Sequence, residues 1–304
     1  MSALTEPNDS PRTKRNAGLS LVLIAALLVA FFAAWPLISE PGFLNTRGGG
    51  DSPFLLQRLH QLEAALRDGH FPVRWMRDAN YGFGYPFFNY YAPLSIYIAA
   101  LFRFLGFSMV RSVEAAQLLG FLLAALGVFI LARRWYRHEW AALLASVAYT
   151  TAPFHLVNVY VRGDSLAEFW AMALYPWVIL AADQLLTTEE KGFPYGRVAA
   201  LALAYAALIL SHNISALIFT PFLLLFILLR WLSFRKDDSS SSVTFSGQHL
   251  RLLLPLLCAG LLLLSLSACF FLPAMVEQGF AQLGPVTDGF FSFANHFRGA
   301  DLVQ

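Results

Sequence analysis

Acidic and basic side chains gather in a few short segments between long apolar runs. Asp51 follows three glycines and precedes Ser52 and Pro53, and Arg162, Asp164 and Glu168 occur together in NVYVRGDSLAEF, residues 158–169. A pair of carboxylates beside an arginine suits a metal ion, or an acceptor hydroxyl held next to a phosphate, because carboxylates bind cations and a guanidinium binds phosphate through two hydrogen bonds. These side chains are therefore candidates for chemistry.

Each carboxylate also has a purely structural interpretation. Asp51 or Ser52 can cap a helix that begins at Pro53. SLAE, residues 165–168, has the pattern of a capping box, in which Glu168 returns a hydrogen bond to the start of its own helix and Asp164 can be the cap. From the residues alone, both interpretations stay open.

Aromatic and histidine side chains offer candidates for ligand binding. YGFGYPFFNYYAPL, residues 81–94, includes Tyr85 and Tyr91, and its glycines and prolines prevent a continuous helix. These rings can form a belt at a bilayer surface, stack on sugar faces or line a lipid tail. His212, between two apolar runs, is either a turn residue with satisfied hydrogen bonds or a phosphate ligand. Arg74, in GHFPVRW, is another candidate for phosphate.

The apolar runs place all these side chains in a membrane protein. Of 304 residues, 58% are hydrophobic and 13% are charged, which is far more apolar than an ordinary soluble domain. A net charge of +2 gives no reason to expect nucleic acid as a partner, and the sequence has no zinc-type spacing of Cys and His. We expect a multi-pass protein of the plasma membrane.

Lys and Arg orient the chain, because short loops rich in these residues stay in the cytoplasm. The basic residues before the first apolar run predict a cytoplasmic tail over 1–18, and the later spans exclude a cleaved signal peptide. Residues 19–304 are expected to form one transmembrane domain, with an outer loop at 40–108 and an outer segment at 273–304. The predicted spans lie near 19–38, 112–132, 139–157, 167–186, 197–211, 214–232 and 251–272.

The predicted outer loop contains two helices that do not cross the membrane. Counting 92–108 as a span would place ARRWYRH, residues 132–138, outside, so we assign 92–108 to a surface helix. A second helix runs from Pro53 to Gly69 and presents an apolar stripe of Leu55, Leu59, Leu62 and Leu66 opposite Arg58, Gln61 and Glu63. This pattern predicts a helix in the membrane interface. All the candidate residues then face the outer leaflet.

The order of these motifs resembles the GT-C superfamily of membrane glycosyltransferases. Within it, the chain looks most similar to bacterial membrane proteins labelled as related to 6-pyruvoyl-tetrahydropterin synthase. The resemblance rests on Asp51 after the first span, on GHFPVRW at 69–75, on GYPFFNYYAPL at 84–94 and on YVRGDSLAE at 160–168. Nothing in the sequence supports a soluble pterin enzyme.

The resemblance implies an all-α bundle of about seven spans with a GT-C-like core. It implies transfer of a sugar from a polyprenyl-phosphate or polyprenyl-diphosphate donor to an acceptor on the outer face. Asp51 would be the base, Asp164 or Glu168 would be the second acid, and Asp51 and Glu168 could hold Mg²⁺ or Mn²⁺ if a cation is needed. The donor would meet five binding residues, namely Arg74, Arg162, His212, Tyr85 and Tyr91.

Two other classes of protein remain alternatives. A transporter or flippase for lipids or sugars should show inverted halves or charges inside its spans, and a non-catalytic membrane scaffold should tolerate loss of all three carboxylates. The expected partners are the lipid-linked sugar donor and membrane lipids. Many members of the family that the chain resembles carry further spans and a soluble C-terminal domain, so the chain is either a minimal core or, as we expect, a piece of a longer protein.

Overall fold

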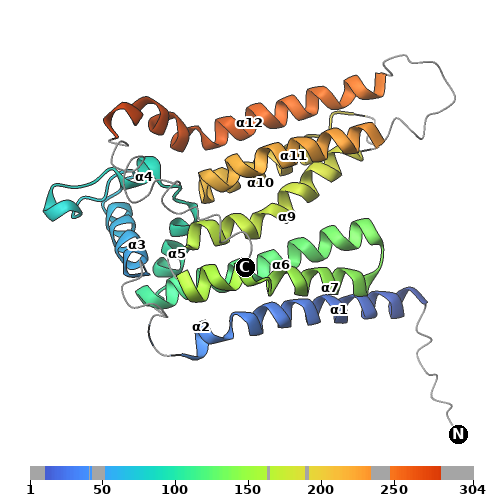
Figure 1. The fold of residues 1–304 in the computed structure, drawn as a ribbon, viewed down its shortest axis with the longest axis horizontal. Helices are drawn as coiled ribbons and strands as arrows, with labels where there is room; N and C mark the ends of the chain where they lie inside the picture. Colours follow the sequence, from blue (N-terminus) through green and yellow to red (C-terminus); the bar gives the residue numbers. More distant parts are fainter. Residues whose placement is uncertain are drawn as a thin grey trace, which may run out of the picture.

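A computed structural model describes residues 11–40, 42, 52–162, 165–188, 192–233 and 247–281, and these residues form a bundle of helices (Figure 1). The helices in chain order are α1 (Pro11–Ala33), α2 (Trp35–Ser39), α3 (Ser52–Arg67), η1 (Asn80–Gly82), α4 (Phe87–Tyr90), α5 (Leu94–Phe104), α6 (Met109–Tyr136), α7 (Glu139–Thr150), α8 (Pro153–Leu156), η2 (Val157–Arg162), α9 (Leu166–Leu186), α10 (Tyr195–Ser211), α11 (Asn213–Ser233), α12 (Gly247–Glu277) and η3 (Gln278–Phe280).

A helix lies at each of the seven predicted span positions, but the helices differ in length. Four of them, α6, α9, α11 and α12, are long and apolar enough to cross a membrane. α7 and the segment Pro153–Arg162 would add a fifth span if this pair, bent by 42°, crosses as one unit, whereas α1 and α10 have shorter apolar stretches. The prediction of an all-helical protein with several candidate membrane spans is confirmed, and the number seven stays a prediction.

Successive long helices run in alternating directions, so the bundle has two distinct ends (Figure 1). The start of α1, the turn from α6 to α7 and the starts of α10 and α12 lie at one end. We call it the basic end, after Arg133 and Arg134 in the last turn of α6 and Arg137 directly after it. α2 to α5 and the starts of α6, α9 and α11 lie at the other end, which we call the aromatic end, after residues 81–94. The loops predicted to be cytoplasmic thus share one end, and their orientation in a membrane stays a prediction.

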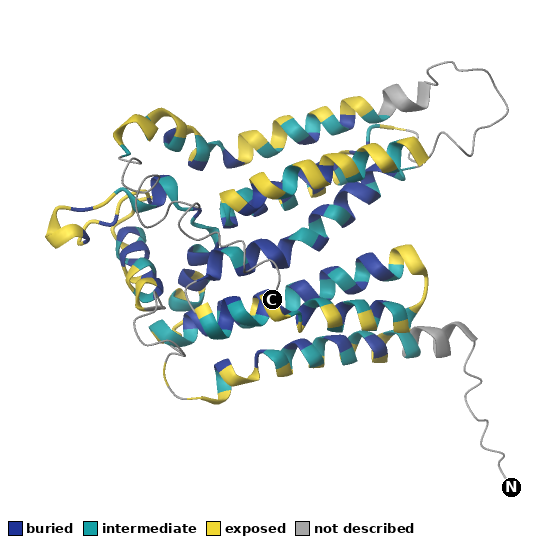
Figure 2. Ribbon diagram, viewed as in Figure 1, coloured by how far each residue is buried: buried dark blue, intermediate teal, exposed yellow. Residues whose placement is uncertain are grey.

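The long helices differ in how much of their surface the protein covers (Figure 2). α9 is the central helix, because it contacts α5, α6, α10, α11 and α12. Within the most apolar window of α9, 78% of the residues are buried, compared with 17% in α11 and in α12. α11 and α12 therefore present long rows of leucine outward, as lipid-facing helices do.

The boundaries of α3 agree closely with the sequence prediction. The helix begins at Ser52, one residue before the predicted first position, and ends at Arg67. Gly69 adopts a positive φ of 83°, and its N–H donates to the carbonyl of Leu66, while the N–H of His70 donates to the carbonyl of Ala65. These bonds satisfy the last carbonyls of the helix in the manner of a glycine C-cap.

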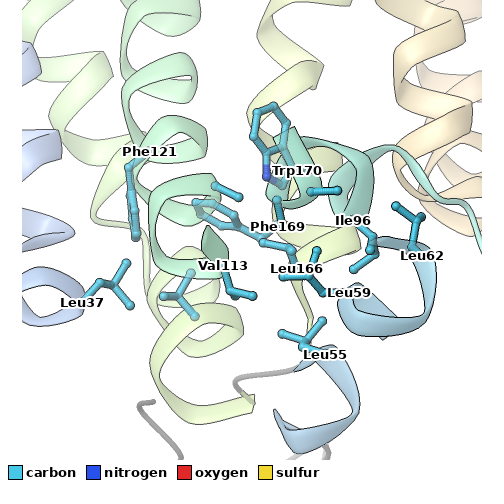
Figure 3. Close-up of a cluster of buried hydrophobic side chains, with 14 of the residues drawn as sticks. Leu37, Leu55, Leu59, Leu62, Ile96, Val113, Phe121, Leu166, Phe169 and Trp170 are labelled. Carbon is cyan, nitrogen blue, oxygen red and sulfur yellow. The ribbon is translucent and has the colours of Figure 1, made fainter. Parts of the chain in front are cut away.

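The apolar stripe of α3 faces protein, whereas the position of the helix at a membrane interface stays a prediction. Leu55, Leu59 and Leu62 are fully buried in the main hydrophobic core, where Figure 3 shows Leu59 and Leu55 below Leu166 of α9 and Leu62 beside Ile96 of α5. An apolar stripe is equally suited to lipid and to protein, because both remove it from water. α3 therefore packs mainly against α5 and α6.

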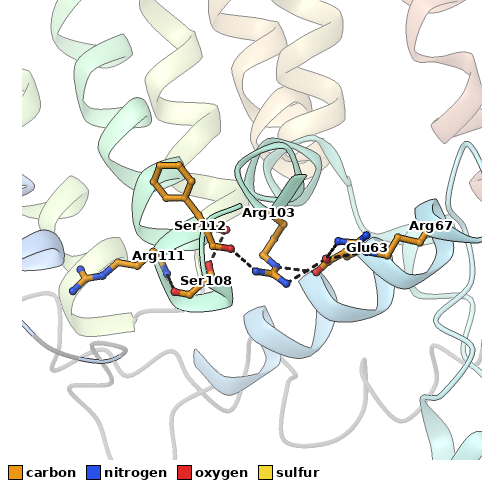
Figure 4. Close-up of polar contacts among 7 residues, drawn as sticks. Glu63, Arg67, Arg103, Ser108, Arg111 and Ser112 are labelled. Atoms are coloured by element: carbon orange, nitrogen blue, oxygen red, sulfur yellow. Dashed lines mark hydrogen bonds and ion pairs between the residues drawn. The ribbon is translucent and has the colours of Figure 1, made fainter. Parts of the chain in front are cut away.

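The predicted polar face of α3 is also largely covered. Gln61 is 4% exposed and Glu63 is 5% exposed. The Gln61 side chain donates to a carboxylate oxygen of Asp78 and accepts from the Asp78 N–H, both at 3.0 Å, and Glu63 accepts from Arg103 of α5 at 2.8 Å (Figure 4). Because the side chains of neighbouring segments satisfy these groups, they can be buried without water.

Candidate functional site

Three of the predicted site residues lie at the aromatic end of the bundle, and two of them are paired. Arg162 ends η2, a short π-helical turn, and Glu168 lies in the first turn of α9. Nη1 of Arg162 donates to Oε2 of Glu168 at 2.6 Å and to Oδ1 of Asn158 at 3.1 Å. His212, at the break between α10 and α11, is close enough for the charges of both residues to act on its imidazole.

The contacts of Glu168 decide between its two interpretations. Ser165 occupies the N-cap position of α9, but its side chain makes no capping hydrogen bond. Glu168 instead pairs with Arg162, which comes from the preceding element. The capping-box pattern is therefore not realised here, and Glu168 joins two elements at the aromatic end, where the N-terminus of α9 further favours its negative charge.

His212 has a defined hydrogen-bonding state. Its Nδ1 lies 2.6 Å from the Ser215 hydroxyl and accepts the N–H of Ser215 at 3.3 Å. A neutral imidazole that accepts at Nδ1 carries its hydrogen on Nε2, so Nε2–H is the donor that remains for a ligand. Burial, the largest effect, lowers the pKa of His212; Glu168 opposes this shift and Arg162 adds to it. The ring is therefore neutral at pH 7.

Tyr175 of α9 extends this group. Its hydroxyl interacts with that of Ser215 and lies within range of the Glu168 charge, and its ring stacks on Phe219 at 4.5 Å between centroids. Sequence reasoning missed Tyr175 and Ser215. Tyr175 follows Glu168 by seven residues, which places both on one face of the helix, and that spacing could have identified it.

Asp51 and Asp164 lie outside the described residues. Their predicted roles stay predictions, as does the predicted approach of Asp51 to Glu168. Among the residues that the structure describes, no three His, Cys, Asp or Glu side chains form a group that could hold a metal ion. The prediction that Asp51 and Glu168 bind Mg²⁺ or Mn²⁺ is therefore also untested.

The aromatic segment forms a second group with α3. The Arg58 guanidinium lies 4.8 Å from the ring centroids of both Phe87 and Tyr91, which are stacked at 4.6 Å. A hollow of about 220 Å³ lies beside them, and its lining includes Arg58, Tyr85 and Phe87 but not Arg162, Glu168 or His212. The helical spacing of α3 predicts only that Arg58 lies on its polar face and gives no sign of its contact with Phe87 and Tyr91. Spacing along the sequence does not show which aromatic rings an arginine contacts.

Arg74 lies next to the second group in the chain. Its carbonyl accepts the N–H of Phe88 at 3.1 Å, and its side chain is exposed. Within the described part of the chain, its guanidinium makes no hydrogen bond or ion pair. Arg74 is thus available to an anion, but the contacts do not place it with Arg162 and His212.

A pair of contacts ties the aromatic segment to the end of α12. The side-chain amide of Asn89 donates to Oε2 of Glu277 at 2.5 Å, and the Tyr90 hydroxyl donates to the Glu277 carbonyl at 2.7 Å. These residues are almost 190 positions apart, so no local pattern could have paired them. The contacts fix the aromatic segment against the bundle.

Comparisons with known proteins agree with the membrane assignment. Residues 88–281 match a family described as "6-pyruvoyl-tetrahydropterin synthase related domain; membrane protein". The chain is similar to a protein of Lactococcus lactis subsp. cremoris (strain MG1363), named only "Uncharacterized protein", with 24% identity over 231 residues that cover 74% of this chain and 35% of that protein. The chain thus spans about a third of the length of this relative. Arg162, Glu168 and His212 lie inside the family match.

Proposed function

The chain belongs to the family of membrane proteins with a 6-pyruvoyl-tetrahydropterin synthase related domain, and we propose that it is a membrane glycosyltransferase. It transfers a sugar from a polyprenyl-phosphate donor to an acceptor on the outer face of the plasma membrane. The observation that carries this proposal is the Arg162–Glu168 pair, with His212 at the same aromatic end within range of both charges. The resemblance of the motifs around these residues to GT-C enzymes supports it.

The proposal includes seven spans, with the N-terminus and the basic end in the cytoplasm. The alternating helix directions and the shared position of the basic loops support this topology (Figure 1). α10 has 17 residues and is therefore about 25 Å long, slightly less than the apolar core of a typical bilayer. A local thinning of the bilayer accommodates such a mismatch at modest cost.

The proposed transfer is an inverting displacement at the anomeric carbon. The acceptor hydroxyl oxygen forms the new bond to this carbon, the bond from the carbon to the phosphate oxygen breaks, and the lipid phosphate leaves with the electron pair. Asp51 takes the proton of the acceptor hydroxyl as general base. The main remaining need is positive charge at the phosphate, because charge builds up there as the bond breaks.

Arg162 and His212 are suited to hold that phosphate. The Arg162 side chain is 47% exposed although it pairs with Glu168, and a guanidinium offers further N–H donors. His212 contributes its Nε2–H. Glu168 orients Arg162 and is the second acid that we favour; if a divalent cation is needed, Asp51 and Glu168 would hold it, and the cation would offset the phosphate charge.

The test uses the full chain in nanodiscs with a panel of synthetic polyprenyl-phosphate hexoses. The readouts are release of polyprenyl phosphate and appearance of the transferred sugar. We expect Asp51→Asn, Glu168→Gln and Arg162→Gln each to lower the rate by about 100-fold or more, the usual loss when a transition-state contact is removed. An EDTA arm tests the cation requirement.

Glu139→Gln is the matched control. Glu139 also pairs with an arginine, Arg133 at 3.8 Å, and its side chain is 27% exposed compared with 23% for Glu168, but it lies at the basic end. Full transfer by a folded Asp51→Asn protein would overturn the proposal. A scaffold would also tolerate Asp51→Ala, Asp164→Ala and Glu168→Ala together, and a flippase would move a fluorescent donor across the bilayer without cleaving it.

A further inference from the structure

A cavity of about 580 Å³ opens at the basic end, far from the residues proposed for sugar transfer. Its walls come from the end of α6, the last turns of α9 and the second half of α11. This volume lies within the range of small-molecule sites. The lining residues are Arg134, Trp135, Arg137, Asp183, Thr187, Phe226 and Arg230.

A buried carboxylate organises the cavity. Asp183 is 1% exposed, and each of its oxygens accepts a hydrogen bond from a different arginine, from Nε of Arg134 at 2.5 Å and from Nε of Arg230 at 2.9 Å. Nη2 of Arg134 also donates to the Thr187 hydroxyl at 2.5 Å. Asp183 therefore fixes two guanidinium groups from separate helices at the edge of one cavity.

The charges of the cavity do not cancel. Among the described lining residues, three arginines face one aspartate, so the balance is three positive charges against one negative charge. Arg137, directly after α6, lines the same cavity as the two arginines on Asp183. Such an excess of positive charge at the end of a helical bundle favours an anionic ligand.

The surroundings of the cavity are apolar. The rings of Trp135 and Phe226 lie 6.0 Å apart on its wall. The same stretch of α11 exposes Leu225 and Leu229, each by more than half. A ligand with an anionic head and an apolar tail fits this combination, because its head meets the arginines while its tail lies along α11.

We propose that this cavity binds the phosphate of an anionic glycerophospholipid from the surrounding leaflet. Basic pockets between membrane helices bind the head groups of such lipids, and each arginine near the surface contributes about 1 kcal/mol. A free phosphate ester would share the contacts with the arginines. It would not use the apolar flank of α11, so the bilayer lipid is the preferred ligand.

The test is native mass spectrometry of the full chain with dioleoyl phosphatidylglycerol and dioleoyl phosphatidylcholine at equal concentrations. We expect the wild-type protein to bind the phosphatidylglycerol at least about tenfold more strongly. Arg137→Gln should lower this preference by about fivefold, the change equivalent to one arginine contact. Arg137 is chosen because it does not bond Asp183 and is exposed, so its loss should leave folding intact.

Arg133→Gln is the control, because Arg133 carries the same charge at the end of α6 and pairs with Glu139 outside the cavity. Equal binding of the two lipids, or an equal loss in Arg133→Gln, would overturn the proposal. Displacement of the lipid by millimolar glycerol 3-phosphate would show that the ligand is a free phosphate ester. If Arg137→Gln lowers the melting temperature, Arg137→Lys decides: it keeps the charge, so retained preference supports the proposal and lost preference contradicts it.

Discussion

Asp183 at the basic end and Glu168 at the aromatic end pair with arginine in opposite ways. At the basic end, Asp183 is buried and each of its oxygens is bonded by an arginine from a regular helix. At the aromatic end, Glu168 and Arg162 are partly exposed and stand where a π-helical turn meets the start of α9. His212, beside them, lies in a break between helices and keeps Nε2–H for a partner.

This difference separates a structural carboxylate from one that can take part in chemistry. A buried carboxylate whose oxygens are both satisfied within the protein fixes the helices that hold it, and removing it leaves charges without partners. A partly exposed pair contributes little to stability, but its donors can reach a ligand. We therefore expect substitution of Asp183 to affect folding, and substitution of Glu168 or Arg162 to affect activity.

Asp183→Ala is the substitution with the largest expected effect on stability. It would leave Arg134 and Arg230 facing each other without the carboxylate between them, at a cost of about 2–3 kcal/mol, which is less than for a fully buried pair because both guanidinium groups are more than a third exposed. Glu168→Gln should cost less than about 1 kcal/mol, because that pair is partly exposed. Thermal unfolding of the detergent-solubilised protein, followed by scanning fluorimetry, measures both.

Glu139→Gln serves as the reference for a partly exposed pair at the basic end. It separates the effect of burial from the effect of location, and it should unfold close to the wild-type temperature. The comparison of the two ends fails if Glu168→Gln lowers the melting temperature as much as Asp183→Ala does.

Gly120→Ala tests the packing between α6 and α9, two of the helices that run from one end of the bundle to the other. A methyl group at Gly120 would lie 2.4 Å from Cε1 of Phe169, and Phe169 is fully buried. Overpacking of a closed core typically costs about 1–3 kcal/mol. Gly260→Ala in α12 is the control, because nothing lies within 4 Å of the added methyl group, and it should be neutral or slightly stabilising in the same unfolding assay.

α3 shows how far the sequence predicts the fold. The leucine spacing and Gly69 located the helix and its end, because these signals are local. The partners of the helix were not predictable, because Glu63 and Arg103 are 40 residues apart and a leucine stripe does not distinguish lipid from protein. The bend after α7 was missed as well, although Pro153 stands directly after it.

The candidate site shows the same limit. Arg162 and Glu168 were found because they are close in the sequence, and His212 was placed on their side by the predicted topology. Ser215 and Tyr175 were missed, since only the packing of α9 against α11 brings their hydroxyls together. The cavity around Asp183 was missed because its charges lie in three helices that the sequence treats as separate spans.

Glu63→Gln tests a buried carboxylate at the aromatic end. Burial by itself would raise the pKa of Glu63, but hydrogen bonds and charges from Arg103 and Arg67 outweigh it and lower the pKa below its usual value of 4.5. The contribution of these bonds, about 1–2 kcal/mol, is therefore complete above pH 4.5 and is lost as the pH falls through the lowered pKa. The wild-type and Glu63→Gln melting temperatures should differ at pH 7 and converge below pH 4.5, and a difference that persists in acid would contradict this assignment.

The smallest expected effect is on the pKa of His212. The direction of the shift in this pKa distinguishes the effect of Arg162 from that of Glu168. Because Arg162 lowers the pKa of His212 and Glu168 raises it, Arg162→Gln should raise this pKa and Glu168→Gln should lower it further. Histidine NMR of the labelled protein, with the His212 signal assigned from His212→Asn, measures both shifts, and Arg133→Gln at the basic end should cause none. Shifts in the same direction in both variants would mean that a rearranged backbone, and not the two charges, controls the ring. Protonation would place a hydrogen on Nδ1 and break its bond from the Ser215 N–H, so the stability that His212 contributes is complete above pH 6.5 and is lost as the pH falls from 6.5 through the lowered pKa. Because Arg162→Gln raises this pKa toward 6.5, the loss of stability in acid should be smaller in that variant than in the wild-type protein.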